Sequence, residues 1–162
     1  MKPGKLTLFA GKMGAGKSTM ALQLATTRCA VLISEDEWLA SLYPGQIAGL
    51  DDYLHYSGQL KPQIKKLVQS ILQTGAEVVL DYPANTLNQR TWLKSIFEEI
   101  QAPHELVFLD VADEMCLQQV HQRRQTDPAR AKTDTAAMFE AVNQYFVAPS
   151  PAEGFVITTI SR

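Results

Sequence analysis

The segment Gly-Lys-Met-Gly-Ala-Gly-Lys-Ser at positions 11–18 constrains the fold more than any other feature of the sequence. It fits the phosphate-binding pattern G-x-x-x-x-G-K-[ST] at every fixed position. A mostly apolar run at 6–10 predicts a buried strand before it, and residues 18–27 predict a helix after it. In such a unit, backbone N–H groups and the positive end of the helix dipole converge on one phosphate chain. The segment therefore predicts a nucleotide-binding loop; the alternative is a glycine turn that merely joins strand to helix.

Individual positions of the loop have expected roles. Its three glycines permit the backbone angles and the close approach that a phosphate chain needs. Lys17 can reach the outer phosphates, and the Ser18 hydroxyl can ligate magnesium. Lys12 fits a solvated loop lysine, and Thr19 is expected to pack in the first helical turn. The residues predicted to bind the nucleotide are Gly11, Lys12, Met13, Gly14, Ala15, Gly16, Lys17, Ser18 and Thr19.

Length and composition predict one globular domain over residues 1–162, with 46% hydrophobic and 20% charged residues. No apolar run approaches the roughly 20 residues that span a bilayer. The first five residues lead directly into the expected first strand, which leaves no room for a signal peptide. Cys29 and Cys116 lack the spacing of a metal site or a disulfide framework, so both are expected to be reduced and buried. These features favour a cytoplasmic protein.

Charge argues against a strong nucleic-acid footprint, because the net charge is −2 and the isoelectric point is near 5.9. The distribution of charge is more informative than its total. Residues 30–60 contain no Lys or Arg, although the same window holds several carboxylates. These are Glu35, Asp36, Glu37, Asp51 and Asp52.

Strands and helices are expected to alternate along the chain. The further strands are predicted at 30–33, 78–80, 105–109 and 155–159, and the further helices at 34–42, 60–75, 86–100, 113–124 and 134–146. Residues 46–58 are expected to be irregular or briefly helical, and Pro62 to lie in a first helical turn. Such alternation predicts a parallel sheet with helices on both faces. Ligands of these sheets bind beyond the carboxyl ends of the strands.

Carboxylates follow two of the expected strands. Asp81 ends the apolar run at 78–80, where it can hold magnesium beside the Ser18 hydroxyl or cap a turn. Ser34 and Glu37 form a capping-box pattern after the second strand. This leaves Asp36 as the favoured residue to accept a proton from an acceptor hydroxyl, or to orient that hydroxyl. The neighbouring residue Glu35 is its main competitor for this role.

Basic residues gather around the polar segment 125–133. Arginine suits the charge that phosphoryl transfer spreads over several oxygens, so a nucleotide-clamping role is expected for Arg123 or Arg124. Favourable placement at the negative end of a helix is the competing explanation. For Arg130 the sequence leaves both explanations open, and His121 is expected to have a structural role.

Arg90 follows Asp81 in the next expected helix. It can reach a substrate anion at the edge of the sheet, or it can pair with a surface carboxylate, and the sequence leaves both open. Tyr53, His55 and Tyr56 lie where an acceptor can dock, although ordinary packing explains them better.

These residues together resemble the P-loop kinases of the small-molecule and polynucleotide kinase branch. Within this branch the chain is most similar to AAA_33-type ATP-binding proteins, near the zeta-toxin-like kinases. The resemblance covers nearly the whole chain. It rests on the loop at 11–18, Ser-Glu-Asp-Glu-Trp at 34–38, Leu-Asp-Tyr-Pro-Ala-Asn-Thr at 80–86, Gln89-Arg90 with Trp92, and Val-Phe-Leu-Asp at 107–110 before a helix ending in Arg123-Arg124.

The resemblance implies an α/β, three-layer P-loop NTPase fold with a five-stranded parallel sheet of order 2-3-1-4-5 and a lid at about 124–133. It implies transfer of the γ-phosphoryl group of ATP to a hydroxyl, with Mg²⁺. By position, Lys17 and Ser18 match the phosphate-loop pair, Asp36 matches the base, and Arg123 and Arg124 match the lid arginines. The expected catalytic residues are thus Lys17, Asp36, Arg123 and Arg124, and the expected metal ligands are Ser18 and Asp81.

One position departs from the family. Many relatives carry an arginine three residues after the carboxylate that Asp36 matches, and this chain has Leu39 there. Together with the window at 30–60 that lacks Lys and Arg, this favours a neutral or cationic acceptor such as a sugar, an amino alcohol or a nucleoside-like compound. The expected protein is an ATP-dependent kinase, a monomer or homodimer without membrane or nucleic-acid partners. A polynucleotide 5′-hydroxyl kinase and a nucleotide-dependent ATPase or regulatory module are the alternatives.

Overall fold

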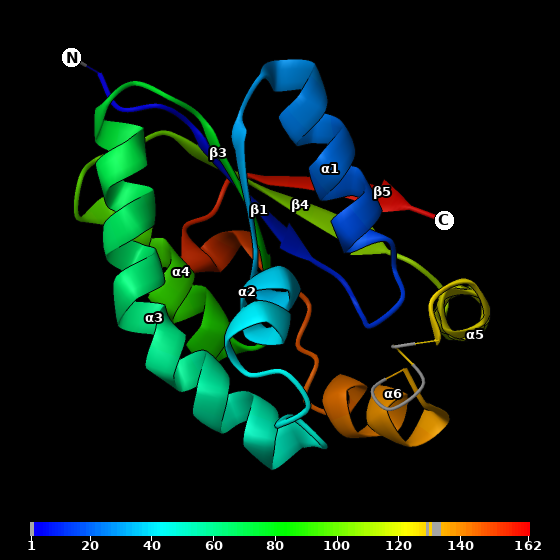
Figure 1. Ribbon diagram of the computed structural model, residues 1–162. Coiled ribbons are helices and arrows are strands. Elements are labelled where there is room, and N and C mark those ends of the chain that lie inside the picture. Colours follow the sequence, from blue (N-terminus) through cyan, green and yellow to red (C-terminus); the bar gives the residue numbers. More distant parts are fainter. Residues whose placement is uncertain (1, 129, 131–133) are drawn as a thin grey trace.

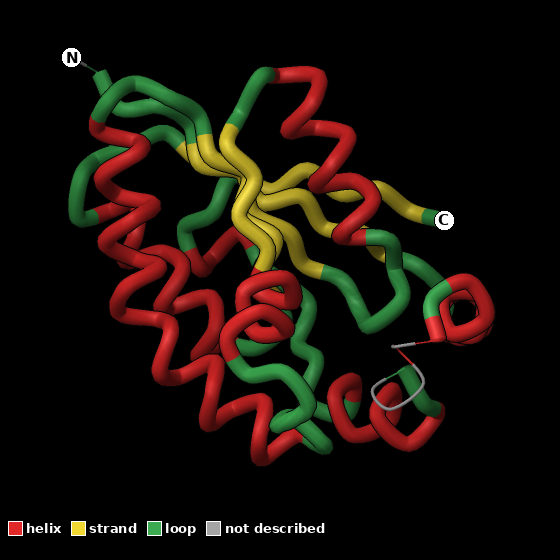
Figure 2. Tube along the Cα trace, viewed as in Figure 1, coloured by secondary structure: helices red, strands yellow, loops and turns green. Residues whose placement is uncertain are grey.

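A computed structural model describes residues 2–128, 130 and 134–162. Five parallel strands form one sheet in the order β2-β3-β1-β4-β5, as the family resemblance implies (Figures 1 and 2). The strands are β1 (Leu6–Ala10), β2 (Val31–Ser34), β3 (Val78–Pro83), β4 (His104–Asp110) and β5 (Ile157–Ser161). β1 is the central strand and all five of its residues are buried. The predicted α/β fold class is therefore confirmed.

Helices cover both faces of the sheet (Figure 1). They are α1 (Lys17–Arg28), α2 (Glu35–Leu42), α3 (Leu50–Gln73), α4 (Leu87–Glu98), α5 (Asp113–Thr126) and α6 (Ala136–Asn143), with a short 3₁₀ helix, η2 (Pro151–Glu153). One apolar core lies between the sheet and α3 with α4, and a second lies between the sheet and α1 with α5. No helix in the described part of the chain is both long and apolar enough to cross a membrane.

The long helix α3 differs from prediction. It begins at Leu50 instead of near residue 60, so Pro62 lies inside it rather than in its first turn. A proline ring collides with the carbonyl of the residue four positions earlier, which here belongs to Gly58. The polar Ser57 at a buried position also hid the helical pattern.

Smaller differences concern the ends of elements. Cys116 is buried as predicted, whereas Cys29 is exposed because it ends α1 in a left-handed conformation with φ 52°. The sequence favours Asp113 as the cap of α5, but Asp113 is the first helical residue and Ala112 is the cap. The last helix begins at Ala136 after the Thr135 cap, two residues later than predicted.

Candidate nucleotide-binding site

The glycine loop joins β1 to α1 at the carboxyl end of the sheet, as predicted. Gly14 and Gly16 have φ values of 83° and 101°, which side chains disfavour. A Cβ on Gly14 would lie 2.4 Å from the Cys116 carbonyl oxygen of α5. Glycine at this position therefore allows both the turn and the close packing of α5 against the loop.

Several N–H groups of the loop point to no protein acceptor. Within the described residues, no hydrogen bond is donated by the N–H groups of Gly14, Gly16, Lys17, Ser18 and Thr19. The first N–H groups of a helix have no partner within the helix, so this row of open donors is available to a ligand. Concave rows of this kind at a helix start bind anions. Thr19 is exposed and does not pack in the first turn, contrary to expectation.

Two asparagines hold the outer part of the loop. The Asn85 carboxamide oxygen accepts from Gly11 N at 2.9 Å, and the Asn143 carboxamide oxygen accepts from Met13 N at 3.1 Å. Sequence reasoning missed both roles. Asn85 lay within the segment 80–86 that carried the family resemblance, whereas nothing in the sequence distinguished Asn143.

Lys17 folds back over the loop. Its ammonium group donates to the carbonyl oxygens of Gly11, at 2.5 Å, and Lys12, at 3.1 Å. Burial lowers the pKa of Lys17 to about 8, with a smaller lowering by Arg123, and the charges of Asp81 and Asp36 oppose the shift. A nearby phosphate would favour the charged form of Lys17.

Lys12 is not simply solvated. Its ammonium group forms an ion pair with Asp113 at 2.7 Å and lies 5.7 Å from the centre of the Phe146 ring. These contacts direct the side chain toward the start of α5.

Ser18 and Asp81 come together as predicted. The Ser18 hydroxyl donates to the Asp81 carboxylate at 2.7 Å. Burial raises the pKa of Asp81, although the Ser18 hydrogen bond opposes the shift. The two oxygen ligands fit Mg²⁺, which binds proteins through one or two carboxylates and takes its other ligands from water and phosphates. The described residues contain no group of three or more His, Cys, Asp or Glu side chains placed to hold a metal ion.

The two competing carboxylates of α2 have separate environments. Ser34 pairs with Asp81 across β2 and β3, so α2 begins beside the expected metal site. Glu35 is only 3% exposed and accepts hydrogen bonds from the hydroxyls of Tyr53, at 2.5 Å, and Ser57, at 2.6 Å. Burial raises the pKa of Glu35 to about 7. Glu35 thus belongs to the packing between α2 and α3.

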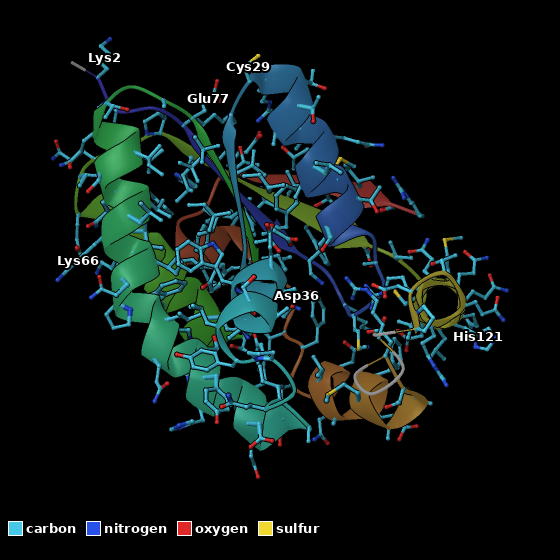
Figure 3. The ribbon with its side chains drawn as sticks, viewed as in Figure 1. Lys2, Cys29, Asp36, Lys66, Glu77 and His121 are labelled. Carbon is cyan, nitrogen blue, oxygen red and sulfur yellow. The ribbon has the colours of Figure 1, made fainter. Side chains whose placement is uncertain are left out.

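Asp36 is exposed at the start of α2 (Figure 3). Its negative charge raises the pKa values of both Lys17 and Asp81, so its carboxylate lies within electrostatic range of the loop. The Ser34 hydroxyl accepts from Glu37 N at 3.3 Å, which is the first half of the expected capping box. Of the two carboxylates, Asp36 is the one open to a ligand.

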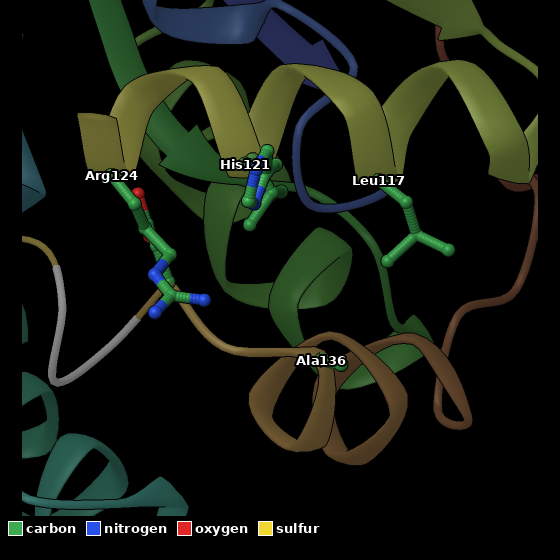
Figure 4. Close-up of a pocket in the computed structure, with 6 residues that line it drawn as sticks. Leu117, His121, Arg124 and Ala136 are labelled. Atoms are coloured by element: carbon green, nitrogen blue, oxygen red, sulfur yellow. The ribbon is translucent and has the colours of Figure 1, made fainter. Parts of the chain in front are cut away.

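The arginines of α5 take different directions. Arg123 forms two hydrogen bonds of 3.1 Å with the buried carboxylate of Asp134. Arg124 instead lines a cavity of about 130 Å³ between α5 and α6 (Figure 4). Arg130 lies 3.7 Å from the Asp134 carboxylate and 3.6 Å from that of Asp127. The expected lid at 124–133 is helical through Thr126, and its residues 129 and 131–133 lie outside the described part of the chain.

Arg90 is a structural residue. It is 1% exposed, and its Nε donates to the Glu153 carboxylate at 2.7 Å. A second nitrogen donates to the carbonyl oxygens of Ala84 and Val147. Pairing with a carboxylate is therefore the alternative that holds, although Arg90 itself is buried and only Glu153 is partly exposed.

Comparison with known proteins agrees with this geometry. The AAA_33 family model, described as an AAA domain, matches residues 6–149. No curated protein matches the chain. Solved structures with the same fold include the APS kinase CysC of Mycobacterium tuberculosis in complex with AMPPNP and APS. It is 16% identical, with a TM-score of 0.68, over 98% of this chain and 90% of that one.

Two further structures are similar. A sugar kinase from Janibacter sp. HTCC2649 is 15% identical, with a TM-score of 0.66, over 98% of this chain and 86% of that one. Kti12 of Chaetomium thermophilum, in complex with ADP-AlF3, is 18% identical, with a TM-score of 0.70, over 96% of this chain and 88% of that one. The family match, the sheet order and the glycine loop agree, and the chain belongs to the AAA_33 family.

Proposed function

We propose that the protein is an ATP-dependent phosphotransferase that moves the γ-phosphoryl group of ATP to a hydroxyl of a small, non-anionic acceptor. The observation that carries this proposal is the set of loop N–H groups that have no acceptor among the described residues, those of Gly14, Gly16, Lys17, Ser18 and Thr19. The side chains of Lys17, Ser18 and Asp81 lie beside these N–H groups. The exposed carboxylate of Asp36 lies within electrostatic range of Lys17.

The loop residues hold the phosphate chain, and each neighbouring side chain has a separate task. The open N–H groups and the Lys17 ammonium bind the phosphates and share their charge. Ser18 and Asp81 would hold Mg²⁺, which neutralises charge as the phosphoryl group moves. Asp36 takes the proton of the acceptor hydroxyl, whose oxygen bonds to the γ-phosphorus as the bond to the β-phosphate oxygen breaks. ADP leaves, and the phosphorylated acceptor remains.

The charges around Asp36 support a non-anionic acceptor. Leu39 is 4% exposed and packs in the core, so the position at which many relatives carry an arginine has no polar group here. Arg90 is occupied by Glu153. Lys61 lies 5.3 Å from the centre of the Trp92 ring. A phosphorylated or carboxylated acceptor would thus approach several carboxylates with little compensation.

Release of ADP from Mg·ATP, measured with sugars, amino alcohols, nucleosides and a 5′-hydroxyl oligonucleotide, tests the proposal. We expect at least one neutral or cationic compound to raise the rate sharply. Lys17→Ala should abolish the reaction, whereas Asp36→Asn should preserve ATP binding and remove acceptor-dependent release. Full activity of Asp36→Asn would exclude Asp36 as the base. Slow ATP loss that no acceptor changes would favour the ATPase or regulatory alternative, and labelling of the oligonucleotide would favour the polynucleotide kinase.

A further inference from the structure

A buried carboxylate contacts two arginines, one in the last turn of α5 and one in the segment that follows it. Asp134 is 3% exposed, and an unpaired charge at such a position would be strongly unfavourable. Both of its oxygens accept from Arg123, from Nε and from a terminal nitrogen, at 3.1 Å each. Arg130 approaches the same carboxylate at 3.7 Å. One carboxylate therefore orients two guanidinium groups.

The face of α5 that carries Arg123 is the face that packs on the glycine loop. A Cβ on Gly14 would lie 2.4 Å from the Cys116 carbonyl oxygen and 2.7 Å from a Val120 methyl group. Arg123 follows Val120 by three positions, so it lies on the same side of the helix one turn farther along. The positive charge of Arg123 also lowers the pKa of Lys17. The guanidinium therefore lies beside the site where phosphates are expected.

We propose that Asp134 is a positioning residue that fixes Arg123, and with it Arg130, toward the phosphoryl group in transfer. This inference rests on the proposed function. An arginine has five N–H donors, and the paired contact with Asp134 uses two of those on Arg123, which leaves donors for a phosphoryl oxygen. A guanidinium fixed before the reaction needs no reorganisation when charge develops on the oxygens in flight.

The backbone of Arg130 is tied to the same buried acid as its side chain. The carbonyl oxygen of Arg130 accepts a hydrogen bond from Asp134 N at 2.7 Å. Side chain and backbone of Asp134 thus both hold Arg130.

Asp134→Asn tests the proposal, because asparagine keeps the shape but loses the charge and one acceptor. The probes are Mg·ADP, and Mg·ADP with aluminium fluoride as a mimic of the phosphoryl group in transfer. We expect Mg·ADP affinity to stay within about twofold or to rise, because the cluster loses a negative charge. The gain in affinity on adding aluminium fluoride should fall by about tenfold to a hundredfold, because the arginines lose their orientation.

Three comparisons separate positioning from a general effect. Glu140→Gln removes one negative charge from an exposed position of α6 and should keep the full fluoride-dependent gain. Asp134→Glu should restore part of the gain. In an Arg123→Lys background, Asp134→Asn should add little further loss, since the two residues act as one unit. If Asp134→Asn does not fold, Asp134→Glu and Arg123→Lys carry the same comparison.

Other results would overturn the proposal. An undiminished fluoride-dependent gain in Asp134→Asn, or equal losses for both probes, would show that Asp134 supports the fold alone. Additive losses with Arg123→Lys would show that the two side chains act separately. A wild-type protein that binds Mg·ADP but gains nothing from aluminium fluoride would also contradict the role of the arginines. Failure of the wild type to bind Mg·ADP or Mg·ATP would instead refute the proposed function.

Discussion

Gly14 shows how one residue can serve backbone geometry and tertiary packing together. Its φ of 83° favours glycine, and the space for a side chain is filled by the Cys116 carbonyl and Val120. The glycine pattern predicted the first property from the sequence. The close packing depends on α5, which lies about a hundred residues farther along the chain, and no local sequence pattern identifies this contact.

Gly14→Ala is therefore expected to destabilise the protein more than Gly→Ala at a glycine that has a positive φ but no close neighbours. Gly45 provides the matched control, because it also has a positive φ, 71°, but nothing lies within 4 Å of a Cβ built there. Gly45→Ala should cost roughly 1–2 kcal/mol for its backbone conformation. Gly14→Ala should cost at least about 2 kcal/mol more, because the carbonyl contact forces α5 away from the loop. Urea unfolding of both variants measures the difference, and equal losses would contradict the packing argument.

At the scale of the elements, most helices and strands could be predicted because hydrophobic spacing is local. α3 was the exception, since Pro62 and Ser57 interrupt its apolar pattern. Ser57 is buried because it donates to Glu35 of α2. A polar residue in a buried stripe thus reflects a partner on another helix, which spacing alone does not reveal.

The buried Glu35 should make stability depend on pH. Its pKa of about 7 in the folded state lies above the ordinary value of 4.5, because burial disfavours the charged form. The folded state therefore binds this proton more tightly than the unfolded chain does. The stabilising effect is complete below about pH 4.5 and is lost as the pH rises through about 7.

Glu35→Gln should remove this dependence, because the neutral amide can still bond to the hydroxyls of Tyr53 and Ser57. The neighbouring charges are Asp36, which raises the pKa of Glu35, and Lys61, which lowers it. Between pH 4.5 and 8 the free energy of unfolding of the wild type should fall relative to that of the variant. The relative change should be on the order of 2–3 kcal/mol in favour of the variant. Urea unfolding from pH 4.5 to 8 measures this, and parallel curves for the two proteins would contradict it.

At the scale of the whole molecule, the sheet order followed from the family resemblance, but the contacts that join distant segments did not. Asp134 and Asn143 carry no motif, and their partners Arg123 and Met13 lie 11 and 130 positions away. Phosphate-loop residues are recognisable because their chemistry requires a fixed spacing. Side chains that hold other residues in place, such as Asp134 and Asn143, need only the right position in space. Many sequences can provide such a position, so no fixed spacing marks these residues.

Arg90 joins three such segments, and its loss should affect the entire fold. It links α4 to Ala84, Val147 and Glu153, while the backbone of Val147 bonds to Asn85, whose side chain holds the glycine loop. Removing Arg90 leaves the partly exposed Glu153 carboxylate without its ion pair and two backbone carbonyls without this donor, which together cost about 3 kcal/mol. Arg90→Met should therefore lower the free energy of unfolding by about this amount.

The half-exposed ion pair between Lys65 and Glu99 offers a control for the loss of a positive charge. Lys65→Met should cost about 1 kcal/mol or less, because water screens such pairs. Adding Glu153→Gln to Arg90→Met should recover part of the lost stability, since no unpaired carboxylate then remains beside the apolar stem of Met. Urea unfolding of the single and double variants measures both effects. Equal costs for Arg90→Met and Lys65→Met would mean that Arg90 does not hold the three segments together.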